Sequence, residues 1–493
     1  MLLALLILFP LIAAAFTGFA GKAQAKQIAF GASVIEFGIF LAAAVQFDPS
    51  AGIQLGFNEA WVEKLGISLH AGMDGISLLM VLLTTFLVPL IILSSFKHDY
   101  SKPGLFYSLV LVMQSALVGV FTSLDAFLFY VFWELALIPI YLICLMWGGK
   151  DRARITLKFF IYTLAGSLLM LVAIIYLYLQ TPGQHTFDID AFYNLRLDPV
   201  TQSWLFWAFF VAFAIKMPVF PFHTWQPDTY VTAPAPGTML LSGIMLKMGT
   251  YGLIRWLLPV APAGVSEWSS WAMALSVTGV VYASCIAMVQ KDFKRLLAYS
   301  SIAHVGLISA GIFSLTREGL NGSLIQMISH GVNVVGLFFI ADIILSRTST
   351  LQTGIGGIRL AAPRFATYFM ILVLASVALP LTNGFVGEFM LITGIFQYAP
   401  WVAGVAGLTI IFGAVYMLVA YQRLCLGTAT VPAGNGGGNG IPLFKDLDRI
   451  ETMVLVPLVI MIFWIGIYPK PLLQLVEPSV EHILQIVKAS TGQ

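Results

Sequence analysis

Four ionisable residues lie in the middle of long apolar stretches of this sequence. They are Glu134, Lys216, Lys247 and Glu388, and each has several apolar residues on both sides. A charge at the centre of a membrane-spanning helix costs about 2.5–3.5 kcal/mol on insertion scales, so such residues are generally functional. Because acids and amines exchange protons, this set indicates a path that moves charge through a membrane.

Two histidines extend the set. His330 lies with Ser323, Gln326 and Asn333 at spacings that put all four on one helical face. In an apolar helix, such a polar face is expected to turn inward, where it can order water. His304 is a further candidate, although a single membrane histidine can also serve only a helix–helix hydrogen bond. The predicted proton relay consists of Glu134, Lys216, Lys247, His304, His330 and Glu388.

A structural role is the alternative for these residues. Glu134 and Lys216 could form a salt bridge that only fixes the register of helices in a membrane spacer. Lys247 has no acid of its own for such a bridge, and burial favours the neutral amine, which suits proton exchange. Sodium suits the path less well, because a lysine ammonium has no acceptor to offer it. Sodium binding at the rims stays open.

The composition is that of an integral membrane protein. Of 493 residues, 59% are hydrophobic and 10% are charged, whereas soluble domains carry about 25% charged residues. The net charge of +2 gives no indication of a nucleic-acid partner. Cys144, Cys285 and Cys425 match neither a disulfide framework nor a metal site, so they are predicted to be packing residues.

Apolar stretches of about 17–25 residues predict an all-α fold with about fourteen transmembrane helices. The first stretch lacks the positive N-terminal region of a signal peptide and is followed at once by another apolar stretch. The predicted spans are residues 2–20, 28–46, 73–95, 104–122, 125–147, 156–180, 203–221, 235–258, 270–290, 294–315, 322–346, 366–398, 402–424 and 452–475.

The loops between these spans differ in charge. Odd-numbered connections carry 16 of the 25 Lys and Arg residues, whereas even-numbered connections and the C-terminal tail carry five. By the positive-inside rule, both termini are therefore predicted on the outer, periplasmic face. The loop charges are typical of a bacterial inner membrane.

Two predicted spans are broken by proline, the seventh near Lys216 and the twelfth near Glu388. They lie five spans apart, which predicts two five-helix repeats related by inversion, a transporter design. The predicted segments are N-terminal helices 1–3 (1–103), a first repeat of helices 4–8 (104–258), a second, inverted repeat of helices 9–13 (259–428), and a Gly-rich loop with helix 14 (429–493).

Three further features receive no role in the relay. Glu36 lies in the middle of the second span and is expected to serve a contact between subunits. Asp342 lies near the inner end of the eleventh span and is expected to be solvated. The glycine-rich run at 434–440 lacks the lysine and the strand–helix context of a P-loop, so a flexible loop is predicted there.

Several motifs resemble one protein family. The sequences KMP at 216–218, FHTWQPD at 222–228 and LK at 246–247 are similar to the proton-translocating core of the antiporter-like subunits of respiratory complex I. FWE at 132–134 and KDFKRLLAYSS at 291–301 resemble further blocks of that family. The resemblance extends through nearly all spans.

The resemblance implies an order for the six relay residues. Glu134 and Lys216 would form an ion pair on the input side, Lys247 would be the central relay, His304 and His330 would hold the connecting water chain, and Glu388 would lie on the exit side. A glutamate at the last position is found in one of three sister subunits, whereas the other two carry lysine.

The resemblance also implies what lies outside this chain. No redox cofactor is expected here, and FMN, iron–sulfur clusters and quinone would be bound by partner subunits. The partners would be other membrane subunits of complex I, including neighbouring antiporter-like subunits, within the lipid bilayer. The alternative is a related subunit of a multisubunit Na⁺/H⁺ antiporter or of a membrane-bound hydrogenase.

Overall fold

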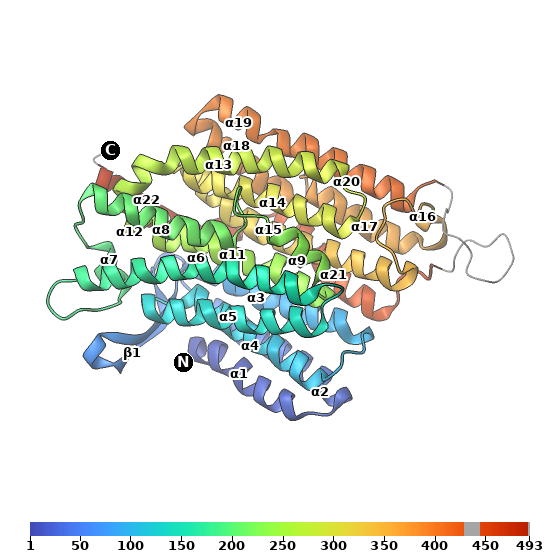
Figure 1. Cartoon of the computed structure of the whole chain (residues 1–493), viewed down its shortest axis with the longest axis horizontal. Coiled ribbons are helices and arrows are strands. Elements are labelled where there is room, and N and C mark those ends of the chain that lie inside the picture. The colour runs from blue at the N-terminus through green and yellow to red at the C-terminus, as the bar shows by residue number, and fades with distance from the viewer. Residues whose placement is uncertain (428–443, 492–493) are drawn as a thin grey trace.

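Long helices lie side by side along a common direction in the computed structural model of this chain (Figure 1). The structure describes residues 1–427 and 444–491, so the glycine-rich run predicted as a flexible loop lies outside the described residues. Eleven helices in the described part are long and apolar enough to cross a membrane. The prediction of a helical membrane protein is therefore confirmed.

The helices and strands follow the order of the apolar stretches. Up to the first break, the elements are α1 (Leu2–Phe19), α2 (Lys22–Val45), β1 (Gln54–Val62), the 3-10 turn η1 (Glu63–Leu65), β2 (Ile67–Met73), α3 (Gly75–Ser94), the 3-10 turn η2 (Ser95–Lys97), α4 (Pro103–Thr122), α5 (Ala126–Trp147), α6 (Arg152–Gln180), α7 (Ile189–Tyr193) and α8 (Pro199–Lys216).

After the break, the chain continues with shorter elements and then with long helices again. These elements are α9 (Gln226–Thr232), α10 (Ala235–Leu240), the π turn η3 (Leu241–Met245), α11 (Leu246–Gly252), the π turn η4 (Leu253–Leu257), α12 (Leu258–Val260), α13 (Pro262–Val289), α14 (Phe293–Phe313), α15 (Arg317–Thr348), α16 (Ile358–Ala361), α17 (Pro363–Ser376), α18 (Asn383–Tyr398), α19 (Pro400–Ala406), α20 (Leu408–Cys425), α21 (Arg449–Ile467) and α22 (Lys470–Thr491).

Three predicted spans are not among the eleven long apolar helices. Span 203–221 stops being helical after Lys216, where α8 ends, and span 366–398 is divided between α17 and α18. Span 235–258 is a helix whose regular pattern is interrupted by η3 and η4, on either side of Lys247. π turns are rare and occur frequently at functional sites. Each irregularity therefore lies close to a predicted relay residue.

The second connection and the C-terminal region differ from the prediction. The second connection forms an antiparallel hairpin of β1 and β2, with Phe57 opposite Ala71, which the prediction did not include. Helix α21 ends at Ile467 rather than near residue 475. Tyr468 precedes a proline and is therefore disfavoured in helical conformation.

Residues Lys470–Thr491 form the further helix α22 (Figure 1). This helix packs against α3, α13 and α15. Its buried apolar residues recur at helical spacing and cover one face. A Cβ atom at Gly75, at the start of α3, would lie 1.8 Å from the Leu475 carbonyl oxygen. Only glycine allows this close approach of the two backbones.

Aspartates begin several of the long helices. A side-chain oxygen accepts a hydrogen bond from a backbone N–H of the first turn in each case, which satisfies a donor that the helix leaves free. The carboxylate also lies at the positive end of the helix dipole. These N-caps are Asp74 on α3, Asp125 on α5, Asp198 on α8, Asp292 on α14 and Asp448 on α21.

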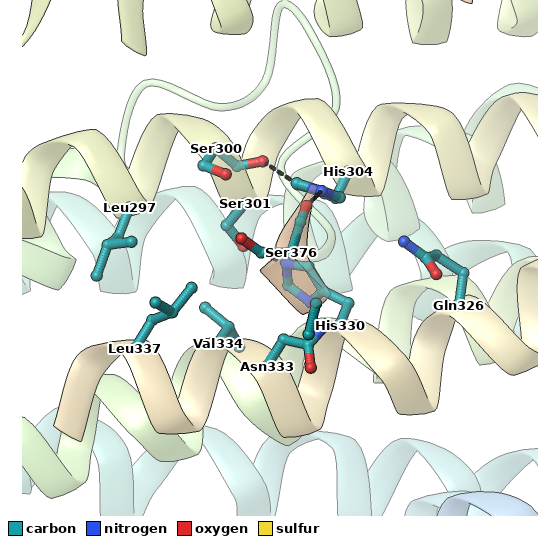
Figure 2. Close-up of a pocket in the computed structure, with 11 residues that line it drawn as sticks. Leu297, Ser300, Ser301, His304, Gln326, His330, Asn333, Val334, Leu337 and Ser376 are labelled. Atoms are coloured by element: carbon teal, nitrogen blue, oxygen red, sulfur yellow. Dashed lines mark hydrogen bonds between the residues drawn. The ribbon is translucent and has the colours of Figure 1, made fainter. Parts of the chain in front are cut away.

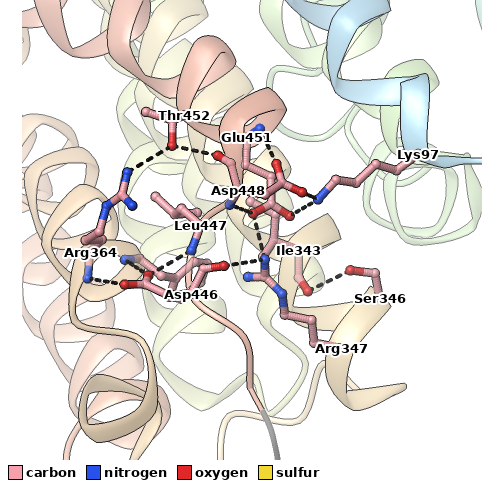
Figure 3. Close-up of polar contacts among 11 residues, drawn as sticks. Lys97, Ile343, Ser346, Arg347, Arg364, Asp446, Leu447, Asp448, Glu451 and Thr452 are labelled. Carbon is pink, nitrogen blue, oxygen red and sulfur yellow. Dashed lines mark hydrogen bonds and ion pairs between the residues drawn. The ribbon is translucent and has the colours of Figure 1, made fainter.

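A network of ion pairs joins four helices at the end of the bundle where most basic residues lie, here called the basic end (Figure 3). Glu451, in the first turn of α21, accepts from Lys97 at 2.8 Å and from Arg347 at 2.6 Å. Asp446 accepts from the backbone N–H groups of Arg364 and Phe365 at the start of α17. Because Lys97 follows α3 and Arg347 ends α15, the network fixes four helices relative to one another.

Replacing the central carboxylate of this network should destabilise the protein. The Glu451 side chain is only 4% exposed, and Glu451→Gln would leave the nearly buried Arg347 without its charge partner. Removing one partner of a buried ion pair costs about 3–5 kcal/mol. We expect a clearly lower melting temperature of the purified protein.

The matched control is Glu481→Gln, which removes one carboxylate from the exposed pair with Arg317. Exposed pairs contribute little, so this variant should melt close to wild type. Equal melting temperatures for Glu451→Gln and Glu481→Gln would contradict a stabilising role of the network.

Candidate functional site

The break after α8 determines where Lys216 lies. Pro218 and Pro221 cannot donate to a helical hydrogen bond, so the helix stops and the chain turns before α9. The Trp225 indole N–H donates to the Ile215 carbonyl at 2.9 Å and closes this turn. Lys216 is buried, and its ammonium lies over the Trp133 ring at 5.2 Å from the ring centre, a cation–π contact.

Glu134 lies beside this lysine but does not bond it. The Lys216 Nζ and the Glu134 Oε1 are both buried, and neither has a hydrogen-bond partner among the described residues. The predicted ion pair is therefore not closed in this structure, because the ammonium faces the indole of Trp133 instead. The carboxylate is still close enough to act electrostatically on Lys216.

Lys247 is held at the centre of the bundle by two acceptors. Its Nζ donates to the Ser242 carbonyl oxygen at 2.7 Å and to His330 Nδ1 at 2.9 Å. Ser242 belongs to the π turn η3, whose wider backbone pattern departs from the regular α-helical ladder. The close fit extends to Gly249, where a Cβ atom would lie 2.7 Å from the Phe213 carbonyl oxygen on α8.

His330, His304 and Glu388 continue from Lys247 in one line of contacts. His330 Nε2 lies 3.0 Å from Ser301 Oγ, and the rings of His330 and His304 are 5.7 Å apart between centres. His304 Nε2 lies 3.2 Å from Glu388 Oε1. The structure therefore brings Lys247, His330, His304 and Glu388 together from α11, α15, α14 and α18.

The hydrogen-bond partners of the two histidines differ in kind. His304 Nδ1 faces the Ser300 carbonyl at 2.7 Å, and its Nε2 faces the Glu388 carboxylate and the Ser376 carbonyl. Acceptors on both sides fit an imidazolium, which donates from both nitrogens. His330 Nδ1 instead faces the donor Lys247, which fits a neutral imidazole with a free lone pair.

A small cavity of about 20 Å³ lies among these residues (Figure 2). This volume is enough for one water molecule, provided that polar groups hold it. Ser301, His304, His330 and Asn333 contribute to the cavity wall, and the Asn333 Oδ1 atom is buried without a partner in the described part of the chain. Their arrangement can hold a water between the two histidines.

The polar face predicted on the eleventh span is buried throughout. Gln326 donates from Nε2 to Glu388 Oε1 at 3.2 Å, and Asn333 lines the cavity. Ser323 instead donates to the backbone carbonyls of Ile308 and Gly319. Three of the four residues therefore face the site, and Ser323 serves helix packing.

A second buried charge, which was not among the predicted site residues, lies on the same predicted span as Lys247. Arg255 Nη2 lies 2.5 Å from Asp74 Oδ1, and both side chains are buried. Arg255 lies inside the predicted span 235–258, so its charge in an apolar stretch was a detectable signal. The Arg255 Nε also contacts the Tyr251 hydroxyl, which donates to the Phe121 carbonyl. This cluster holds the end of the helix opposite the basic end.

Several other predictions need correction. Glu36 is fully buried among helices of its own chain, which does not support a contact with another subunit. Asp342 is not solvated: its side chain is 11% exposed and pairs with His98 at 2.7 Å. Cys144 and Cys425 are buried as expected, whereas Cys285 is exposed on the surface of this chain. Within the described residues, no group of three or more His, Cys, Asp or Glu could hold a metal ion.

Two family models match this chain, and both are named for NADH:quinone or NADH-ubiquinone oxidoreductase. Residues 123–413 match the family model "NADH:quinone oxidoreductase/Mrp antiporter, TM", and residues 4–120 match "NADH-ubiquinone oxidoreductase chain 4, amino terminus". NADH-quinone oxidoreductase subunit M of Rickettsia conorii is 40% identical over 461 residues, 93% of this chain and 92% of the relative. The chain belongs to the subunit M family of NADH-quinone oxidoreductases.

Two further relatives support the assignment. Subunit M of Rhodobacter capsulatus is 38% identical over 510 aligned positions, which cover 100% of this chain and 98% of the relative. A chain in the structure of respiratory complex I from Thermus thermophilus with bound NADH superposes with a TM-score of 0.88 at 31% identity, covering 99% of this chain and 100% of that chain. This subunit M homologue is thus a membrane subunit of the proton-translocating NADH:quinone oxidoreductase, respiratory complex I.

The assignment favours complex I over the alternative of a multisubunit Na⁺/H⁺ antiporter or a membrane-bound hydrogenase. The longer family model covers both complex I and Mrp antiporter subunits, whereas the model of the N-terminal 4–120 region is specific to chain 4.

Loss of the His330 ring should slow proton pumping without abolishing it. His330→Ala removes the acceptor of Lys247 and the contact to Ser301, but a water molecule can partly bridge the gap. We expect NADH-driven proton pumping in membrane vesicles to fall by about tenfold. The control is His482→Ala, because that ring is exposed on α22. An unaltered rate in His330→Ala would make His330 a packing residue.

Proposed function

We propose that this chain moves protons through the membrane along Glu134, Lys216, Lys247, His330, His304 and Glu388, driven by quinone reduction in other subunits. The observation that carries the proposal is the line of contacts from Lys247 to Glu388. Four ionisable side chains from four helices meet there without another described function. A structural spacer would need neither the histidines nor a second lysine.

The alternation of protonation states along this line supports proton transfer. The hydrogen-bond partners fit a charged Lys247, a neutral His330, a charged His304 and an ionised Glu388. A proton from Lys247 Nζ can pass to His330 Nδ1. At the same time, His330 Nε2 releases its own proton toward Ser301 and the cavity. His304 can pass a proton from Nε2 to Glu388 Oε1 and then be reloaded from the cavity.

The open geometry of Glu134 and Lys216 supports a switching role for this pair. The ammonium lies over Trp133 without a hydrogen bond, and the Glu134 Oε1 is equally free. Closing the pair would stabilise the proton on Lys216, whereas opening it in a buried setting favours release. A release from Lys216 would then favour protonation of Lys247. The pair thereby controls when the central lysine receives a proton.

The membrane arrangement that we propose has fourteen crossings. The eleven long apolar helices are supplemented by three irregular ones, α8 with α9, α10 to α12, and α17 with α18. Residues 104–258 and 259–428 would be the two inverted five-helix repeats, preceded by the segment 1–103 and followed by 429–493. The basic end would face the inside of a bacterial inner membrane, with both termini outside.

The coupling must reach this chain from elsewhere in the complex. FMN, iron–sulfur clusters and quinone would be bound by other subunits, and the energy of quinone reduction would arrive electrostatically or through a conformational change. Glu134 is only half-buried at the surface of α5, so a neighbouring antiporter-like subunit could act on it directly.

The central test is Lys247→Ala in the assembled complex. The relay predicts that coupled NADH oxidation and proton pumping fall by at least about 100-fold, because no other described side chain can replace Nζ between Ser242 and His330. The control is Lys470→Ala, which removes an exposed amine at the start of α22. Wild-type pumping by Lys247→Ala would overturn the proposed relay.

A second test concerns the pair beside Trp133. Glu134→Gln removes the carboxylate that acts on the buried Lys216, the only one to do so among the described residues, so coupled turnover should fall by about tenfold. Glu134→Asp keeps the charge on a shorter side chain and should retain part of the activity. Both variants are measured by NADH-driven proton uptake after assembly has been verified on a native gel. Full pumping by the glutamine variant would remove Glu134 from the relay.

A further inference from the structure

A second set of buried polar residues lies between the basic end and Lys247. At the surface, His98 Nε2 lies 2.7 Å from Asp342 Oδ2, with side chains 32% and 11% exposed. Below them, Lys294 is buried and donates to the carbonyls of Val231 and Ala233, at 3.3 and 2.7 Å. The Asp342 carboxylate attracts this ammonium. The relay described above uses none of these three side chains.

Tyr230 and Gln226 connect this set to the interior. The Tyr230 ring packs against Phe338, 5.7 Å between ring centres, and Asp342 lies four residues later on the same face of α15. Tyr230 is therefore about one helical turn, roughly 5 Å, deeper than Asp342. Gln226 lies a further turn along α9, toward the break after Lys216.

Both side chains have unused hydrogen-bonding capacity. The Tyr230 hydroxyl and both polar atoms of the Gln226 amide are completely buried, and they make no hydrogen bond of normal geometry with the described residues, although the two groups lie close to each other. Buried polar groups of this kind are usually satisfied by ordered water. A hydrated segment at Tyr230 and Gln226 is the simplest explanation of both groups.

The backbone beside this segment leads directly to Lys247. Thr238 donates from Oγ1 to the Tyr230 carbonyl at 3.0 Å, and Ser242 donates from Oγ to the Thr238 carbonyl at 2.7 Å. The Ser242 carbonyl in turn accepts from Lys247 Nζ. The segment around Tyr230 is therefore two short steps along one helix from the central lysine.

We propose that His98, Asp342, Lys294, Tyr230 and Gln226 form a loading path that carries protons from the basic end to Lys247; this inference rests on the proposed relay. The His98–Asp342 pair takes up a proton from the solvent. Tyr230 accepts a proton at its hydroxyl oxygen while it donates its own onward through water. Lys294 and Gln226 are positioning residues: the first anchors the end of α9 and holds Asp342, and the second holds water.

The charges around His98 determine how loading depends on pH. The hydrogen bond to Asp342 raises the pKa of His98 above its ordinary value, against the opposing effects of burial and of the nearby Lys26 and Lys97. The Tyr100 ring packs beside it without a charge. Because the pKa of His98 is raised, His98 stays protonated at pH values above the ordinary histidine range. It loses its proton as the pH rises through this raised pKa.

The variants Asp342→Asn and Tyr230→Phe test the path in the assembled complex. Inverted native membrane vesicles expose the basic end to the medium, and NADH-driven proton uptake is measured between acidic and alkaline pH. We expect uptake to fall by about fivefold or more in each variant. In Asp342→Asn, the alkaline decline should also move to lower pH, because His98 loses the carboxylate that raises its pKa.

Matched controls keep structural effects apart. Tyr107→Phe removes a buried hydroxyl whose partner is Ser95, and Asp151→Asn removes an exposed carboxylate at the basic end that makes no capping bond. Both should pump like wild type. His98→Gln changes a partly exposed residue and tests the path even if Asp342→Asn fails to assemble. In this variant, the alkaline decline in proton uptake that deprotonation of His98 causes should be absent.

The outcomes separate the loading path from the relay. Wild-type uptake with an unshifted alkaline decline in Tyr230→Phe and His98→Gln would overturn the path, and Lys247→Ala would still report on the relay. The path would be supported if Tyr230→Phe showed reduced proton uptake but oxidised NADH at the normal rate when an artificial electron acceptor was supplied. Wild-type pumping by Lys247→Ala would instead remove the relay on which the path depends.

Discussion

The buried ammonium of Lys247 constrains the rest of the central bundle. An unpaired charge in an apolar interior is costly, so the protein must supply acceptors at this depth. One acceptor is the Ser242 carbonyl in a π turn, and the other is the His330 ring on α15. No carboxylate among the described residues contacts this ammonium. The lysine is therefore held by weak, neutral partners, which leaves its proton available for transfer.

This requirement explains why the helices near the centre are irregular. A regular helix offers no free carbonyl along its length, whereas breaks and π turns release backbone groups that side chains can then satisfy. The Trp225 indole satisfies the Ile215 carbonyl beside the break after α8, and Lys247 satisfies Ser242. The π turns η3 and η4 are tolerated because all of their residues are buried within the protein. Each irregular segment loses regular helical hydrogen bonds and places polar groups at membrane depth.

The two ends of the bundle hold this irregular centre in place. At the basic end, Glu451 joins Lys97 and Arg347, and at the opposite end Arg255 pairs with Asp74, close to where α22 crosses the start of α3. These ion pairs have direct, short contacts, unlike the open arrangement of Glu134 and Lys216. The ion pairs that fix the structure are thus directly bonded, whereas the charges assigned to proton transfer keep part of their hydrogen-bonding capacity unused.

The sequence alone determined the membrane class, the approximate position of nearly every helix and the six candidate relay residues, because hydropathy and isolated charges are local signals. Only the tertiary structure decided which of them touch. Contacts such as Lys247 with His330 join residues far apart in the chain, and the open Glu134–Lys216 geometry depends on where the Trp133 ring lies. The hairpin and the burial of Asp342 were also missed, because each depends on packing against distant segments. Helix α22 was missed because only one of its faces is apolar, so it does not stand out as an apolar stretch.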